Sequence, residues 1–175
     1  IREISKTLAF DRGLNRAYYA QWKSTFPAND WNSIIEKTII EKTAQVKAEQ
    51  LNIFRNLRGL NNALLRGLGP IFIEESFWDR LLTLIQNVRN LRSVEAYHPF
   101  LYSHFPDALI EMYVPMFLLK GEKANDRSGY ADLVRQMKKV IKDIPSGTAQ
   151  IQAVAQQLRD KFPRRPAMLD ELSKL

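Results

Sequence analysis

Apolar residues recur at steps of three and four along the carboxyl-terminal half of the chain. In residues 126–145 the repeating apolar positions are Tyr130, Leu133, Val134, Met137, Val140 and Ile141. This spacing places them on one face of an amphipathic helix. Asp126 offers an N-cap acceptor, and Pro145 prevents continuation because its nitrogen carries no hydrogen. The pattern therefore predicts one helix between these two residues.

The same periodicity predicts two more helices and a short final one. Residues 76–88 begin with Ser76 and Asp79, which resemble a capping box, and residues 147–162 stop before Pro163. Pro166 suits the first position of a last helix, so "FPRRP" is a connector between helices. We expect the following stripe residues of these helices to be buried: Trp78, Leu82, Ile85, Leu133, Met137, Ile141, Leu158 and Phe162.

Prolines and glycines punctuate the rest of the pattern. Residues 93–105 and 107–121 are apolar at helical spacing, and each contains a proline, Pro99 or Pro115, where we expect a kink or a break. Residues 7–26 and 30–43 indicate a helical pair joined across a proline, with Asn29 or Asp30 as the cap. Residues 45–69 are also helical, with interruptions expected at their three glycines.

These elements predict an all-α protein of nine or ten helices without a sheet. Consecutive amphipathic helices with short connections pack as antiparallel neighbours. The helical pairs are about the size of a tetratricopeptide repeat but follow no strict period, so we expect an irregular tetratricopeptide-like α-solenoid array. We expect residues 1–175 to form a single domain, with 59–70 as the one place for a subdivision.

Composition narrows the class of protein. The chain is 45% hydrophobic, and its longest apolar runs are too short to span a membrane, so no membrane partner is expected. It has no cysteine, which excludes disulfides and thiolate metal sites and fits a reducing cytoplasm. It begins at Ile1 without methionine or a leader peptide, which indicates the carboxyl-terminal fragment of a longer protein.

The candidate catalytic and metal-binding constellations are incomplete. Glu95 and His98 have the spacing of half a di-iron carboxylate site, but His104 is preceded at that offset by Leu101, and the chain has no third histidine. No glycine-rich phosphate loop and no nucleophile elbow is present. The two histidines are therefore interpreted as packing or helix-end residues. The sequence predicts no enzyme, no bound metal and no cofactor.

A net charge of +7 raises the question of an acidic partner. The basic residues that would form a nucleic-acid or acidic-partner surface are Arg135, Lys138, Lys139, Lys142, Arg159, Lys161, Arg164 and Arg165. Two functions stay open: a scaffold that binds another protein or the rest of its parent chain, and a basic helical domain that binds nucleic acid. The second requires these cations to share one continuous face. Arg164 and Arg165 are expected to contact helix carboxyl ends instead.

Residues 78–175 resemble the carboxyl-terminal helical region of bacterial proteins that carry a SWIM zinc finger. The segments that carry this resemblance are "WDRLLTLIQN", "YHPFLYSHFPDALIEMYVPMF", "YADLVRQMKKVIKDI" and "LRDKFPRRPAMLDEL". The zinc ligands of that family are cysteines and a histidine, and this chain has no cysteine to supply them. The resemblance therefore implies a helical scaffold beside an amino-terminal zinc finger, with nucleic-acid or protein association as the role.

Overall fold

The computed structural model describes residues 1–11, 13–53 and 57–175, leaving out the side chains of 51–53, 57 and 58. Over this part of the chain it contains ten α-helices and no strand, which confirms the all-α prediction. Among the described residues, no helix combines the length and apolarity needed to cross a membrane. The chain divides into two compact units, Ile1–Val88 and Arg89–Leu175.

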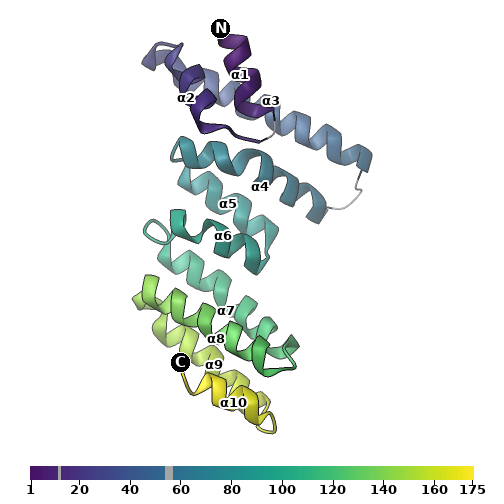
Figure 1. Ribbon diagram of the computed structural model, residues 1–175, viewed down its shortest axis with the longest axis vertical. Coiled ribbons are helices and arrows are strands. Elements are labelled where there is room, and N and C mark those ends of the chain that lie inside the picture. The colour runs from purple at the N-terminus through teal and green to yellow at the C-terminus, as the bar shows by residue number, and fades with distance from the viewer. Residues whose placement is uncertain (12, 54–56) are drawn as a thin grey trace. The chain divides into compact units, whose positions relative to one another are not determined.

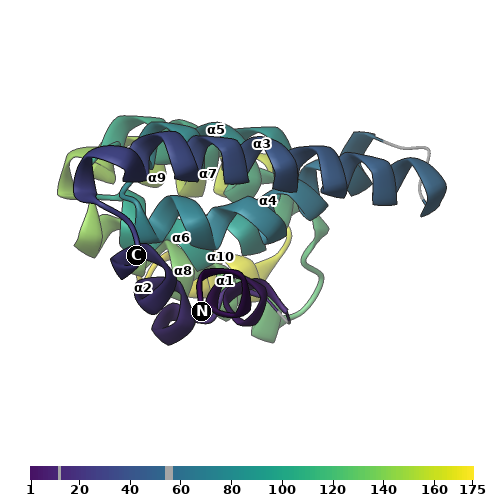
Figure 2. The same cartoon turned by 90° about the horizontal axis from the view of Figure 1, so that it is seen from above.

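The first unit contains five helices, of which successive ones pack together (Figure 1). They are α1 (Arg2–Phe10), α2 (Arg16–Ser24), α3 (Ala28–Ile53), α4 (Leu57–Glu74) and α5 (Trp78–Val88). The pairs α1 with α2, α3 with α4 and α4 with α5 share the main contacts. Figure 2 shows α1 and α2 beside the amino-terminal half of the long helix α3, whose other end extends past them.

The first helical pair begins differently from the prediction. Residues 7–26 do not form one helix, because α1 ends at Phe10 and α2 starts at Arg16. Gly13 adopts a positive φ of 106°, and the Asn15 side chain accepts hydrogen bonds from the first amides of α2. A local glycine and an N-cap asparagine thus override a continuous apolar pattern.

The predicted caps and interruptions around α3 and α4 are also wrong. Helix α3 starts at Ala28, directly after a proline, so Asn29 and Asp30 lie in its first turn. Residues 59–70 lie inside α4. At Gly67 an added Cβ would lie 3.2 Å from Cγ2 of Val46, so this glycine allows α3 and α4 to approach closely.

Ser76 ends α4 and does not cap α5. Its φ is 57°, its amide donates to the Ile73 carbonyl at 3.2 Å, and the Phe77 amide donates to the Phe72 carbonyl at 2.8 Å. These two bonds form a Schellman motif with a serine where glycine is usual. The capping-box prediction is therefore wrong, because the left-handed residue satisfies the end of the preceding helix.

The second unit also packs its helices in chain order. It contains α6 (Leu91–Leu101), α7 (Pro106–Lys123), α8 (Arg127–Asp143), the short 3₁₀ helix η1 (Pro145–Gly147), α9 (Thr148–Lys161) and α10 (Pro166–Leu172). Helix α7 packs against α6, α8 and α9, and α10 packs against α8 and α9. Helices α6 and α7 continue through Pro99 and Pro115, so neither proline breaks its helix.

The start and stop signals of this unit are confirmed. The Asp126 carboxylate accepts the Gly129 amide at 2.7 Å as the N-cap of α8, and α8 ends two residues before Pro145. Helix α9 ends before Pro163, and Pro166 is the first residue of α10. Local capping chemistry therefore predicted these boundaries correctly.

The core contains half of the eight residues that the sequence places there. Ile85, Leu133, Met137 and Leu158 are buried, whereas Trp78, Leu82, Ile141 and Phe162 are only half-buried. Next to two of the misassigned positions, Leu81 and Val140 are buried instead. One residue turns a helix by about 100°, so a small error in the centre of the stripe moves its flank toward solvent.

Candidate functional site

The eight basic residues proposed as an acidic-partner surface lie on α8, on α9 and in the connector before α10. Apart from the two connector arginines, three of them are engaged within the unit. Arg135 pairs with Asp132, Lys161 pairs with Glu122 at 2.6 Å, and the Arg159 guanidinium donates to the Leu172 carbonyl at 2.5 Å. These contacts neutralise or occupy part of the predicted surface.

The two connector arginines differ from each other. The Arg165 guanidinium donates to the carbonyl of Ala124, the C-cap of α7, at 3.1 Å and lies 4.0 Å from the centre of the Phe162 ring. Arg164 is exposed and makes no such contact with the described residues. Arg165 thus makes the helix-end contact expected of a structural residue.

The remaining cations fall into two separate places. Lys138, Lys139 and Lys142 lie in the second half of α8, while the connector is held near Ala124, just before α8 begins. At a rise of about 1.5 Å per residue, Lys138 lies roughly 16 Å along α8 from its first residue, Arg127. The structure therefore does not bring the eight residues into one compact patch.

His98, the candidate metal ligand with the most regular spacing, is a buried packing residue. Its side chain is 2% exposed, with Nε2 3.1 Å from the Asp143 carboxylate and Nδ1 3.1 Å from the Tyr113 hydroxyl. Because a carboxylate only accepts, Nε2 donates to Asp143 and Nδ1 accepts from Tyr113. Burial lowers the pKa of His98, while the hydrogen bond to Asp143 opposes this shift.

Glu95 does not join this histidine in a ligand set. It is half-buried, and desolvation raises the pKa of its carboxyl group, with the charge of Lys120 opposing. Within the part of the chain that the structure describes, no three histidine or acidic residues are placed to hold a metal ion.

A buried acidic network in the first unit has no local signal in the sequence. The Glu75 side chain is 6% exposed and accepts from the Tyr19 hydroxyl at 2.8 Å, the Trp31 indole at 2.8 Å and the Lys23 ammonium at 2.9 Å. Tyr19, Trp22 and Trp31 contact one another edge-on. Three donors occupy the carboxylate, so this cluster joins α2, α3 and the end of α4 and offers no vacant acceptor.

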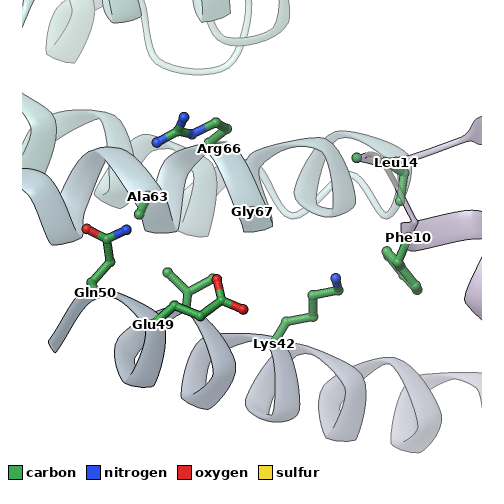
Figure 3. Close-up of a pocket in the computed structure, with 10 residues that line it drawn as sticks. Phe10, Leu14, Lys42, Glu49, Gln50, Ala63, Arg66 and Gly67 are labelled. Carbon is green, nitrogen blue, oxygen red and sulfur yellow. The ribbon is translucent and has the colours of Figure 1, made fainter. Parts of the chain in front are cut away.

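A cavity between α3 and α4 is a candidate for binding. It has a volume of about 480 Å³, and α3 contributes Lys42, Val46, Glu49 and Gln50 to its wall. Figure 3 shows Lys42 and Glu49 extending from α3 into the space below α4, whereas Arg66 lies on the side of α4 that faces away from α3.

A second hollow of about 310 Å³ lies between α1 and the same face of α3. Phe10 and Lys42 line both hollows, so they adjoin along α3. We call the two hollows together the α3 groove. It follows α3 from Thr38 to Gln50, which corresponds to about 18 Å of helix.

Lys42 lies where the two hollows meet. Its ammonium nitrogen is 4.7 Å from the centre of the Phe10 ring. Desolvation lowers the pKa of Lys42, the charge of Glu49 opposes the shift, and that of Lys6 adds to it. Among the described residues, no carboxylate lies within ion-pair distance of this ammonium.

The other charged residues of the groove are already engaged or distant from Lys42. Lys6 pairs with Glu41 at 3.1 Å, and Gln45 donates to the Glu49 carboxylate at 2.9 Å. The sequence carries no local signal for this arrangement. The groove forms only when α1 packs beside residues 38–45 of α3 and α4 packs beside residues 42–50.

Comparison of the chain with protein-family models, curated proteins and solved structures finds no match.

Proposed function

We propose that this protein is a non-catalytic helical scaffold whose α3 groove binds a peptide segment of another protein or of its own parent chain. The observation that carries the proposal is the groove itself, two adjoining hollows along one face of α3. A length of about 18 Å accommodates roughly five or six residues of extended peptide at about 3.3 Å each. Grooves between stacked helices are the usual binding surfaces of helical-repeat scaffolds.

The chemistry of the groove supports a binding role. Its polar side chains carry ammonium, guanidinium, carboxylate, amide and hydroxyl groups. Phe10, Leu14 and Val46 add apolar surface to its lining. No histidine or cysteine lines it to activate one of its threonine hydroxyls as a nucleophile. The resemblance of residues 78–175 supports a place for this scaffold beside a SWIM zinc finger.

A nucleic-acid-binding function is the second proposal, and it rests on the cations without an ion pair. Lys138, Lys139, Lys142 and Arg164 are exposed, and the described residues give none of them a carboxylate partner. The separation of Arg164 from the α8 lysines weighs against a single phosphate-binding surface, since affinity for nucleic acid rises with the number of phosphates neutralised together.

Peptide selection tests the scaffold proposal. The purified protein selects from a phage-displayed library of random 12-residue peptides, and fluorescence anisotropy gives the affinity of each enriched peptide. Gln45, exposed on the wall of the α3 groove, is replaced in Gln45→Trp to fill the hollow between α1 and α3. Gln157→Trp, at an exposed position of α9 outside the groove, is the matched control.

We expect Gln45→Trp to weaken peptide binding at least tenfold and Gln157→Trp to leave it unchanged, with equal melting temperatures. Failure to enrich any peptide, or peptides insensitive to Gln45→Trp, would contradict the scaffold proposal. Filter binding of a single-stranded 20-nucleotide DNA at two salt concentrations tests the alternative. Affinity that falls in a Lys138→Ala, Lys139→Ala, Lys142→Ala variant would favour nucleic acid.

A further inference from the structure

We infer that the α3 groove selects an acidic peptide, in which one carboxylate pairs with the Lys42 ammonium and a neighbouring aliphatic side chain covers Phe10 and Leu14. This inference rests on the proposed scaffold function and adds the chemistry of the partner. It follows from a half-buried cation for which the described part of the chain supplies no ion-pair partner.

The charges around Lys42 compensate it only in part, through the charge of Glu49. Glu49 is seven residues further along α3, a rise of about 10 Å, and its carboxylate accepts from Gln45. Glu41 is the neighbour in sequence but pairs with Lys6. The residues that the structure leaves undescribed, 12 and 51–58, contain no aspartate or glutamate in the sequence. A carboxylate of a bound peptide would therefore give Lys42 the ion-pair partner that the chain does not supply.

Partial burial makes this pairing favourable. The face of the Phe10 ring attracts the ammonium, but an aromatic ring supplies much less than a carboxylate. Desolvation already lowers the pKa of Lys42, which means that the folded protein holds the charged form at a cost. A ligand carboxylate that enters the hollow offsets this cost without having to desolvate a fully hydrated lysine.

The apolar part of the cavity defines the rest of the partner. Phe10 and Leu14 lie together at the end of the cavity nearest Lys42 (Figure 3). Val46 of α3 also lines the cavity. All three are half-buried. An aliphatic residue adjacent to the acidic one would cover this surface and exclude water from the ion pair.

The groove favours a peptide over a nucleic acid as the source of the anion. Glu3, Glu41 and Glu49 also line it, so a phosphodiester chain with one charge per nucleotide would meet several carboxylates. A peptide needs only one acidic residue opposite Lys42. The Lys42 ammonium, which has no ion pair and lies beside the Phe10 ring, matches that single charge.

A charge exchange provides the test. Random 12-residue peptides on phage are selected in parallel on the wild-type protein, on Lys42→Glu and on Lys47→Glu. Lys47 is an exposed residue of the same helix that does not line the α3 groove, so it controls for the change in net charge. Melting temperatures of the three proteins establish that all are folded.

We expect the wild-type protein and Lys47→Glu to enrich peptides with Asp or Glu at one position beside an aliphatic residue. Lys42→Glu should enrich Lys or Arg at that position. For the best wild-type peptide, replacing its acidic residue by the amide should weaken binding about tenfold or more, as expected for loss of a charge-assisted hydrogen bond.

Three results would overturn this inference in distinguishable ways. If the enriched peptides bind Gln45→Trp more weakly but show no acidic preference, the scaffold proposal holds and the role of Lys42 is refuted. An acidic preference unchanged in Lys42→Glu would place the pairing cation elsewhere. Absence of any enriched peptide, or single-stranded DNA that binds in the groove and is lost in Lys42→Glu, would refute both proposals.

Discussion

Glu75 offers the sharpest test of how the first unit is held together, because one carboxylate accepts from three helical side chains. Replacing it in Glu75→Ala leaves the buried Tyr19 hydroxyl and the Trp31 indole without an acceptor. An unsatisfied buried donor costs about 1–3 kcal/mol. Lys23 is 44% exposed, so the loss of its ion pair adds little. For the two donors, the free energy of unfolding should therefore fall by about 2–6 kcal/mol.

Tryptophan fluorescence during urea unfolding measures this change. All three tryptophans of the chain, Trp22, Trp31 and Trp78, belong to the unit Ile1–Val88, so the signal reports on that unit. Lys23→Ala removes one donor and keeps the carboxylate. It should cost no more than about 1 kcal/mol, as expected for a partly exposed ion pair.

A second control separates buried hydrogen bonding from general charge. Glu74 pairs with Arg16, whose side chain is 69% exposed, so Glu74→Ala should change stability by less than about 1 kcal/mol. If Glu75→Ala costs no more than Glu74→Ala, the three hydrogen bonds do not stabilise the unit. If Lys23→Ala costs as much as Glu75→Ala, the ion pair and not the buried donors would be the main contribution.

Three further predictions use the same stability measurements, with circular dichroism for the second unit. Ser76→Gly should raise the free energy of unfolding by about 0.5–1 kcal/mol, because glycine adopts the observed positive φ without steric cost; an unchanged or lower stability would contradict the left-handed assignment. Burial lowers the pKa of His98, so the imidazole binds a proton more readily in the unfolded chain than in the folded protein. The contribution of His98 to the free energy of unfolding should therefore be complete above about pH 6.5 and be lost as pH falls. His98→Gln should abolish this pH dependence of stability, and an identical dependence in the variant would disprove the reasoning. Arg165→Ala should lower the melting temperature through its lost contacts to a helix end and an aromatic ring, whereas Arg164→Ala should not, and equal effects would remove the distinction between them.

Several features of the fold were predictable because their causes are local. Asp126, Pro163 and Pro166 act on the amides and carbonyls of their own or adjacent turns, and the boundaries they signal are the observed ones. The absence of any alternating apolar pattern likewise predicted the all-α class. Capping and periodicity need no information about distant residues.

Local patterns failed where a neighbouring helix decides the outcome. Ser76 was predicted to start one helix but ends the previous one. A serine can either cap the next helix or adopt the left-handed conformation that ends the previous helix, and the local sequence does not distinguish these two roles. Gly67 was predicted to interrupt a helix but lies inside α4, where its missing side chain admits Val46 of α3. The helix survives because close packing offsets the low helix propensity of glycine.

The sequence by itself determined the all-α class and where most of the carboxyl-terminal helices begin and end. Only the tertiary structure decided which side chains meet: Glu75 with donors from α2 and α3, His98 with Tyr113 and Asp143, and Lys42 with the ring of Phe10. These residues are separated by 15 to 56 positions, so no periodicity along the chain relates them. Burial and charge compensation depend on such long-range contacts, and the candidate groove therefore becomes visible only after the helices have packed.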